Sequence, residues 1–176
     1  MPTPFTLGPV GSLETSGSFS DALAGKVSIR GLDHLGIAVA SIAESRSFYE
    51  AALGAKFEGE EVVAEQKVRV AMFRLGVGAG AVSIELLEPL DESSPIAKFL
   101  AKRGPGLHHT AFRVDDTGIA LAAAAAAGLK LIDREPRVGA HGARIGFLHP
   151  QSTGGMLIEF CSHDVVAGSL GSDATE

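Results

Sequence analysis

The chain has 176 residues, 45% of them hydrophobic and 20% charged, which suits one domain or two small modules that share a core. Its net charge of −6 argues against a nucleic-acid partner, because nucleic-acid binders present a basic surface. No apolar run reaches the roughly 18 residues that cross a bilayer, so we expect no membrane partner either.

The two ends of the chain differ in composition from the part between them. Residues 1–28 are dominated by Pro, Gly, Ser and Thr, which predicts a disordered arm with a short helix near 20–23. The arm contains no arginine and lacks the basic start and apolar stretch of a secretory signal, so we expect a cytoplasmic protein. Residues 164–176 read as a second frayed tail. The single cysteine, Cys161, lies in an apolar run and is expected to be a buried thiol in a reducing compartment.

The first module, residues 29–90, is expected to contain one helix and four strands. Its elements are a strand over 31–39, a helix over 42–52, a short strand over 55–58, a polar loop over 58–67, and strands over 68–75 and 81–87. Ser41, with a glutamate three residues later, has the pattern of a helix N-cap, and Gly54 can end that helix. Gly36 and Ala38 lie on the same strand face as His34, and their small size leaves space on that face.

A linker, residues 91–105, leads to a second module over 106–163 with the same order of elements. Its elements are a strand over 107–114, a helix through 122–127, and strands over 129–132, 144–148 and 156–161. In the linker, Ser94 and Pro95 open a helix over 96–102. In the second module, Asp116 or Thr117 caps the helix and a glycine-rich loop covers 138–142.

An internal repeat connects the two modules. His109 follows His34 by 75 positions (109 − 34), each within a Gly-Leu-x-His pattern. Glu159 follows Glu85 by 74 positions (159 − 85), each flanked by apolar residues in mid-strand. A carboxylate in such surroundings is unfavourable to bury without a partner. Two histidines and two glutamates at matched positions therefore predict a metal site built from these four residues.

The ligand types indicate which ion such a site would hold. Imidazole and carboxylate ligands suit divalent Co²⁺, Ni²⁺, Mn²⁺ or Zn²⁺, and the lack of thiolates favours an open catalytic site over a closed structural one. We therefore expect an α+β fold in which two tandem βαβββ modules form a curved mixed sheet around a metal-binding cleft.

The other histidines receive weaker assignments. Strand alternation turns His108 away from His109, so it is expected to support the site or the fold rather than to bind the ion. His149 in a His-Pro turn and His163 after the last strand are expected to be ordinary turn or surface residues. His141, in the glycine-rich loop, is a candidate for contact with substrate, because such loops often form lids.

The duplicated module with its His and Glu positions resembles the vicinal oxygen chelate superfamily and, over about residues 30–162, its methylmalonyl-CoA epimerase family. The stretches that carry the resemblance are 33–39, 85–90, 94–100, 106–109, 139–142, 147–150 and 153–159. The resemblance implies metal ligands at His34, His109 and Glu159, with Glu85 at a position where the family has Gln or Glu.

The resemblance also implies an activity. The family epimerises (2R)/(2S)-methylmalonyl-CoA through an enolate that a divalent ion, above all Co²⁺, stabilises, which implies an acyl-CoA partner and a homodimer. Glu159 would be the catalytic acid/base as well as a ligand. Some members carry a second candidate proton carrier where this chain has Val70, so Gln66, His141 or a water would complete the exchange. The candidate cations for the phosphates of coenzyme A are Lys98, Lys102, Arg103, Arg137 and Arg144.

Other functions are compatible with the same architecture. A glyoxalase-I-type isomerase would act on a glutathione hemithioacetal with the same ligand set. A ring-cleaving dioxygenase would use two His and one Glu with redox-active iron and oxygen. A non-enzymatic small-molecule-binding protein of this fold would do without the metal ligands, which argues against it here.

Overall fold

The structure, a computed structural model, describes residues 25–163, with the side chain of residue 79 excepted. The short helix expected near 20–23 and the tail expected over 164–176 lie outside this range. Within the described range, no helix has the length and apolar character needed to span a membrane.

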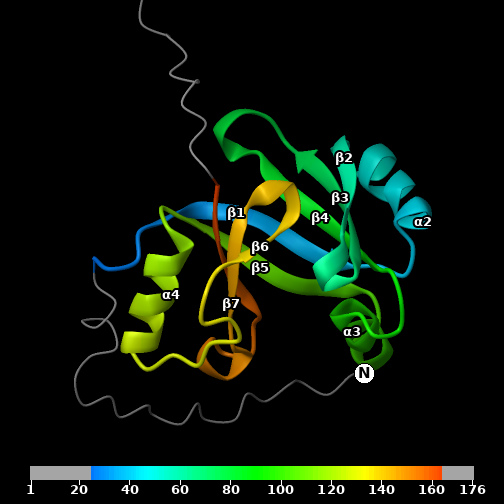
Figure 1. Cartoon of the computed structure of the whole chain (residues 1–176). Coiled ribbons are helices and arrows are strands. Elements are labelled where there is room, and N and C mark those ends of the chain that lie inside the picture. The colour runs from blue at the N-terminus through cyan, green and yellow to red at the C-terminus, as the bar shows by residue number, and fades with distance from the viewer. Residues whose placement is uncertain (1–24, 164–176) are drawn as a thin grey trace, which may run out of the picture.

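Each half of the chain contributes four strands (Figure 1). The first half contains β1 (Ile29–Ala38), α2 (Ile42–Ser47), a π-helical segment (Phe48–Ala52), β2 (Lys56–Val63), β3 (Val68–Leu75) and β4 (Val82–Pro89). Helix α3 (Pro95–Arg103) follows. The second half contains β5 (Gly106–Val114), α4 (Thr117–Ala126), β6 (Arg137–Val138), β7 (Arg144–Leu148) and β8 (Ile158–Ser162).

All of these strands belong to one 8-stranded sheet with the order β2-β3-β4-β1-β5-β8-β7-β6. The antiparallel pair β1–β5 joins the two halves, and each of these strands has a parallel neighbour from its own half, β4 and β8 respectively. The expected α+β class and the mixed sheet of two βαβββ modules are confirmed. The sheet has a pseudo-twofold arrangement, with the first strand of each module at its centre.

The helices pack on the two halves separately, and Figure 1 shows α2 and α4 on opposite sides of the molecule. Ile42 of α2 packs with Phe73 and Leu86 in one core cluster. Leu121 of α4 packs with Phe160 in another. Two further apolar clusters, one with Val70 and Ile96 and one with Ile145 and Phe147, line the inner face of the sheet.

The helix starts follow the expected capping chemistry. The Ser41 hydroxyl accepts a hydrogen bond from the backbone N–H of Glu44 at 3.2 Å. Ser94 caps α3 in the same way. Of the two candidates for α4, Asp116 is the cap, with its carboxylate 2.8 Å from the N–H of Ile119. Each cap satisfies a backbone donor that the first helical turn leaves free.

The loop expected over 58–67 is wrong for its first half, because β2 continues to Val63 and pairs with β3. Residues along β2 alternate between exposed and half-buried. Phe57 packs against the cluster under α2, whereas after a bulge between Phe57 and Gly59 the chain places Glu61 opposite Val70 on the other face. An edge strand needs only one apolar face, so a charged sequence can still form it.

The strand expected over 129–132 is also wrong. In this segment only Leu131 forms an isolated bridge, to Leu148, and the short strand of the second half is instead β6. Leu129 and Leu131 pack against the core cluster under α4. Their apolar alternation therefore reports packing under a helix and not strand pairing.

Candidate metal centre

The strand register brings the four predicted ligands together on the inner face of the sheet. In one row across the central strands, His34 of β1 lies beside Ala111 of β5, which lies beside Glu159 of β8. Two residues along, His109 of β5 lies beside Gly36 of β1, which in turn lies beside Glu85 of β4. Each row therefore places a histidine and a glutamate on either side of one small residue.

The ligand atoms converge on one point. The Nε2 atoms of His34 and His109 are 3.1 Å apart. Nε2 of His34 is 3.4 Å from Oε2 of Glu85 and 3.7 Å from Oε1 of Glu159. Nε2 of His109 is 3.7 Å from Oε2 of Glu159. Ligands at about 2.1 Å from an ion and at right angles to each other lie about 3 Å apart, so these spacings are those of a metal-ligand set.

Burial and hydrogen bonding support the same conclusion. His34, Glu85, His109 and Glu159 are 4%, 7%, 4% and 2% exposed. Among the residues that the structure describes, the buried Oε1 atom of Glu159 has no hydrogen-bond partner. A buried carboxylate oxygen without a partner is strongly unfavourable, and a cation would satisfy it. The donor set and its orphaned oxygen therefore fit a divalent ion.

Gly36 is needed because the ring of His109 lies directly over it. A Cβ atom at this position would lie 2.1 Å from Cε1 of His109 and 2.6 Å from its Nε2. The backbone angle of Gly36 is not of the left-handed kind, so the requirement is one of space alone. This gives a physical reason for the small residue noted in the sequence at this place on β1.

A cavity of about 590 Å³ opens over the four ligands. Val70 forms part of its apolar wall, so this strand position bears no proton carrier. Gln66 and His141 both line the cavity, and the backbone N–H of His141 is held by Glu61 at 2.7 Å. His149 lines neither this cavity nor the second one described below.

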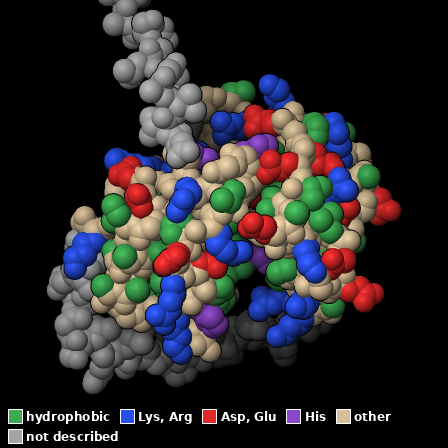
Figure 2. All heavy atoms as spheres, in the orientation of Figure 1, with side chains coloured by type: hydrophobic (Ala, Val, Ile, Leu, Met, Phe, Trp, Pro, Cys, Tyr) green, Lys and Arg blue, Asp and Glu red, His purple; other side chains and the backbone are tan. Residues whose placement is uncertain are grey.

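A second cavity, of about 350 Å³, adjoins the first and shares His108, His109 and Leu157 with it. Of the five cations considered for coenzyme A, Arg103 lines the second cavity and Arg137 lines the first. The other three, Lys98, Lys102 and Arg144, line neither of these two cavities. Figure 2 shows Lys and Arg side chains beside a hollow in the surface near α3.

Two β-bulges change the faces expected from strand alternation. In the β1–β5 ladder, Leu32 and His34 pair with consecutive residues of β5, which leaves Asp33 as the extra residue. On the partner strand, His109 and Leu107 pair with consecutive residues of β1, which leaves His108 extra. Bulges re-aim side chains near functional sites. The expectation that His108 points away from His109 is therefore wrong: the two Nδ1 atoms lie 3.0 Å apart.

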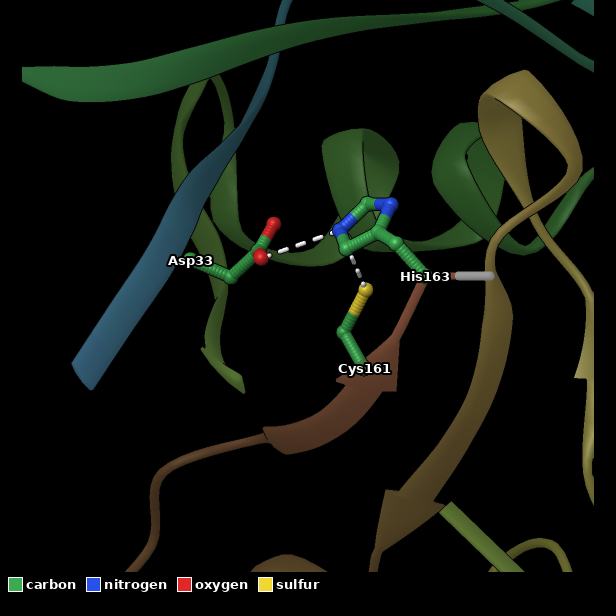
Figure 3. A group of neighbouring side chains, drawn as sticks. All are labelled: Asp33, Cys161 and His163. Atoms are coloured by element: carbon green, nitrogen blue, oxygen red, sulfur yellow. Dashed lines mark hydrogen bonds and ion pairs between the residues drawn. The ribbon is translucent and has the colours of Figure 1, made fainter. Parts of the chain in front are cut away.

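Asp33 was missed in the sequence and is a buried neighbour of the site. Its carboxylate lies 3.0 Å from Nδ1 of His34, 2.7 Å from Nε of Arg113 and 3.0 Å from Nε2 of His163. His163, expected to be an ordinary surface residue, thus belongs to this network, as does the Sγ of Cys161 at 3.4 Å from it (Figure 3). The sequence signal available was that Asp33 and His108 occupy matched positions of the repeat.

The surroundings shift the protonation of these groups. Burial lowers the pKa of His34, but the hydrogen bond to Asp33 and the charges of Glu85 and Glu159 raise it overall to about 9. Burial raises the pKa of Glu159 to about 8, against the opposing charge of His34, and burial also raises the pKa of Glu85. Burial, with the neighbouring His34, lowers the pKa of His109 well below its ordinary value.

Asp33 and Cys161 are shifted as well. Burial alone would raise the pKa of Asp33, but hydrogen bonds from His163, His34 and Arg113 hold it below the ordinary value. Cys161 is buried, as expected, and burial raises the pKa of its thiol. The thiol is therefore neutral, and Asp33 is the anion of this network.

Comparisons of this chain with known proteins all point to the same family. The model of the glyoxalase/bleomycin resistance protein/dioxygenase superfamily matches residues 33–147. The uncharacterized protein YqjC of Bacillus subtilis is 50% identical over 130 residues, which cover 74% of this chain and 90% of that protein. The mitochondrial methylmalonyl-CoA epimerase of Bos taurus is 36% identical over 154 residues, 86% of each chain.

A solved structure adds likeness in three dimensions. It is described as methylmalonyl-CoA epimerase in complex with methylmalonyl-CoA and NH4+. Its identity to this chain is 38%, its TM-score is 0.75, and the match covers 79% of this chain and 98% of that one.

Replacing Gly36 with alanine tests the steric requirement. The added Cβ collides with the ring of His109, so the ring must leave its place. We expect affinity for Co²⁺ to fall at least about tenfold and stability to fall by about 1–3 kcal/mol, as for other overpacked sites. Gly80→Ala, at a glycine with open space around it, is the control. Unchanged Co²⁺ affinity in Gly36→Ala would show that the ring does not need this place.

The raised pKa values predict how the metal-free protein responds to pH. The stability that His34 contributes to the folded protein is fully present below its unfolded pKa of about 6.5 and is lost as the pH rises through its folded pKa of about 9. The stability that Glu159 contributes is fully present below about pH 4.5 and is lost as the pH rises through its folded pKa of about 8. His108 and His109, whose pKa values are lowered, act in the opposite sense until the unfolded residues are largely neutral at about pH 7.5.

We therefore expect the free energy of unfolding of chelator-treated protein to fall from about pH 7.5 to about pH 9. Urea unfolding at several pH values in this window measures it. Glu159→Gln, which removes one of the titrating groups, should flatten the fall. Stability that rises with pH across the window would contradict the assignment.

Proposed function

The chain belongs to the glyoxalase/bleomycin resistance protein/dioxygenase superfamily and, within it, to the methylmalonyl-CoA epimerases, which are isomerases. We propose that it interconverts the (2R) and (2S) epimers of methylmalonyl-CoA with a divalent metal ion. The family expected from the sequence is thereby confirmed. The cytoplasmic location and the homodimer expected with it stay predictions.

The observation that carries the proposal is the convergence of His34, Glu85, His109 and Glu159 on one point beneath a largely apolar cavity. The carbon between a thioester and a carboxylate gives up its proton only if the negative charge on the thioester oxygen is stabilised. A divalent ion, when bound, supplies that stabilisation as a Lewis acid. Co²⁺ is the ion we favour for this nitrogen and oxygen ligand set, with Ni²⁺, Mn²⁺ or Zn²⁺ as alternatives.

The proton transfer is assigned to Glu159. Its carboxylate lines the cavity over the candidate metal site, and in the metal-free protein burial raises its pKa to about 8. A carboxylate can take the C2 proton as a general base, and inversion then requires a proton delivered to the opposite face, for which Gln66, His141 or a water in the same cavity are the proposed candidates. The apolar walls, Val70 and Phe147 among them, keep bulk water from competing for that proton.

The acyl-CoA handle is proposed to run from the first cavity into the second. The two cavities share His108, His109 and Leu157 in their linings, and we propose that the chain of a thioester over the metal site passes these residues. Arg103, at the end of α3, lines the second cavity and is the proposed partner for a phosphate group. Since the chain carries a net charge of −6, a local cation is needed to attract a polyanionic substrate.

Two other functions are alternatives that the same assay distinguishes. A glyoxalase-I-type isomerase would use the same ligands on the adduct of methylglyoxal and glutathione, so substrate turnover and not metal binding separates the two. A non-enzymatic binding protein would retain its ligand after chelation and would turn over neither substrate. The buried four-ligand cluster favours an enzyme over such a protein.

Deuterium exchange tests the proposed reaction. One epimer of methylmalonyl-CoA in deuterated water should gain deuterium at C2 and racemise with the Co²⁺-loaded protein, but not after chelation. Glu159→Gln should lower the rate at least about 100-fold, because a general acid/base is lost. His149→Gln, at a histidine that lines neither described cavity, should leave it unchanged. Absence of exchange with each of the four ions would sink the proposal.

Reversing the charge of Arg103 tests the proposed path of coenzyme A. Arg103→Glu should raise KM for methylmalonyl-CoA about threefold to tenfold with kcat unchanged, since an exposed ion pair contributes up to about 1 kcal/mol. Lys56→Glu, on the exposed face of β2, makes the same change of net charge away from both cavities and is the control. Equal KM values for the two variants would show that Arg103 does not bind coenzyme A.

A further inference from the structure

Two of the three register shifts in the β1–β5 ladder are bulges at matched positions of the repeat. Asp33 is the extra residue of β1 and directly precedes His34. His108 is the extra residue of β5, 75 positions later, and directly precedes His109. Both bulged side chains line the metal cavity. Since strand alternation would have turned each of them to the opposite face, the bulges are what bring them beside the ligands.

Each bulged residue meets the ring nitrogen of its neighbour that faces away from the site. The Nε2 atoms of His34 and His109 face each other at 3.1 Å, so these are the atoms offered to an ion. A neutral imidazole that binds a metal through Nε2 carries its proton on Nδ1. Nδ1 of His34 is 3.0 Å from Oδ1 of Asp33, and Nδ1 of His109 is 3.0 Å from Nδ1 of His108.

Both acceptors are themselves held in place. Oδ2 of Asp33 lies 2.7 Å from Nε of Arg113 and 3.0 Å from Nε2 of His163, so the carboxylate cannot rotate away from His34 without breaking two hydrogen bonds. The ring of His108 packs edge-on against Phe99 of α3, with ring centroids 5.0 Å apart. These contacts fix the orientation of Asp33 and of His108.

We propose that Asp33 and His108 are positioning residues that accept the Nδ1–H of the following histidine, fix its tautomer and aim its Nε2 at the metal ion. The proposal rests on the metal-dependent function above. The two acceptors differ in chemistry: a carboxylate makes His34 the more electron-rich ligand, whereas His109 receives only the dipole of a neutral ring. The duplicated site is therefore asymmetric in its supporting groups although its ligands are matched.

One competing role for Asp33 is as a ligand itself. Its carboxylate, the Sγ of Cys161 and a ring nitrogen of His163 lie within 4.8 Å of one another, a spacing that could hold a second ion (Figure 3). The guanidinium of Arg113 already donates to Oδ2 of this carboxylate. A cation beside that guanidinium would be repelled, so the hydrogen-bonded arrangement favours the positioning role.

Metal titration of variants tests the proposal. Asp33→Asn and His108→Leu should each bind Co²⁺ about 10- to 100-fold more weakly than the unaltered protein, in line with losses at other supporting groups. His108→Gln, which retains an acceptor oxygen, should stay within about threefold. Asp115→Asn removes a carboxylate from an exposed Arg–Asp pair and is the matched control, with unchanged affinity expected. Urea unfolding of the metal-free variants checks that each is folded.

A second readout does not depend on any variant. In the Zn²⁺-loaded protein, ¹⁵N–¹H spectra of the histidine rings should show protons on Nδ1 of His34 and His109. Protons on Nε2 would overturn the proposal, as would Co²⁺ affinities of Asp33→Asn and His108→Leu within threefold of the unaltered protein.

The outcomes separate this proposal from the proposed function. If the unaltered protein binds metal and epimerises but the variants bind equally well, only the positioning role falls. If the unaltered protein binds no ion, both fall. If it binds two ions per chain and Asp33→Asn loses one entirely, Asp33 is a ligand and its positioning role is overturned.

Discussion

The pairing of β1 with β5 is the interaction on which the rest of the site depends. It places His34 opposite Ala111 and Gly36 opposite His109, so that each histidine has one small residue between itself and a glutamate of the other module. A shift of the register by one residue would turn the ligands to the other face of the sheet. The duplication thus produces a site only because the two copies pair in this register, with Ala111 and Gly36, which have little or no side chain, between the histidines and the glutamates.

Burying four ionisable side chains at one point is unfavourable in itself, and the surrounding structure compensates for it in two layers. The first is the hydrogen-bond network of Asp33, Arg113 and His163, which offsets the desolvation of His34. The second is the set of apolar clusters on the inner face and under α2 and α4, which supply the burial that keeps the sheet closed around the cluster. Among the described residues the Oε1 atom of Glu159 stays without a partner, and a bound cation would satisfy it.

The same arrangement explains how one superfamily can host several reactions. The candidate ligands come from the four central strands, whereas part of the cavity wall comes from residues outside them, such as Gln66 and His141. Substitutions in the wall change what lies over the metal without altering the register that builds it. Val70 is such a wall residue: its apolar side chain leaves this part of the wall without a titratable group.

The sequence by itself determined the order of elements, the helix caps and the four candidate ligands. Periodicity and capping patterns depend only on residues close in sequence, and an internal repeat is visible by comparing the chain with itself. The tertiary structure alone decided the extent of β2, the place of β6, and the inward turn of Asp33 and His108. A charged edge strand has no apolar period to reveal it, and a bulge breaks the alternation from which faces are predicted. The contact of His163 with Asp33, across 130 positions of sequence, follows from the order of strands and not from either residue's neighbours.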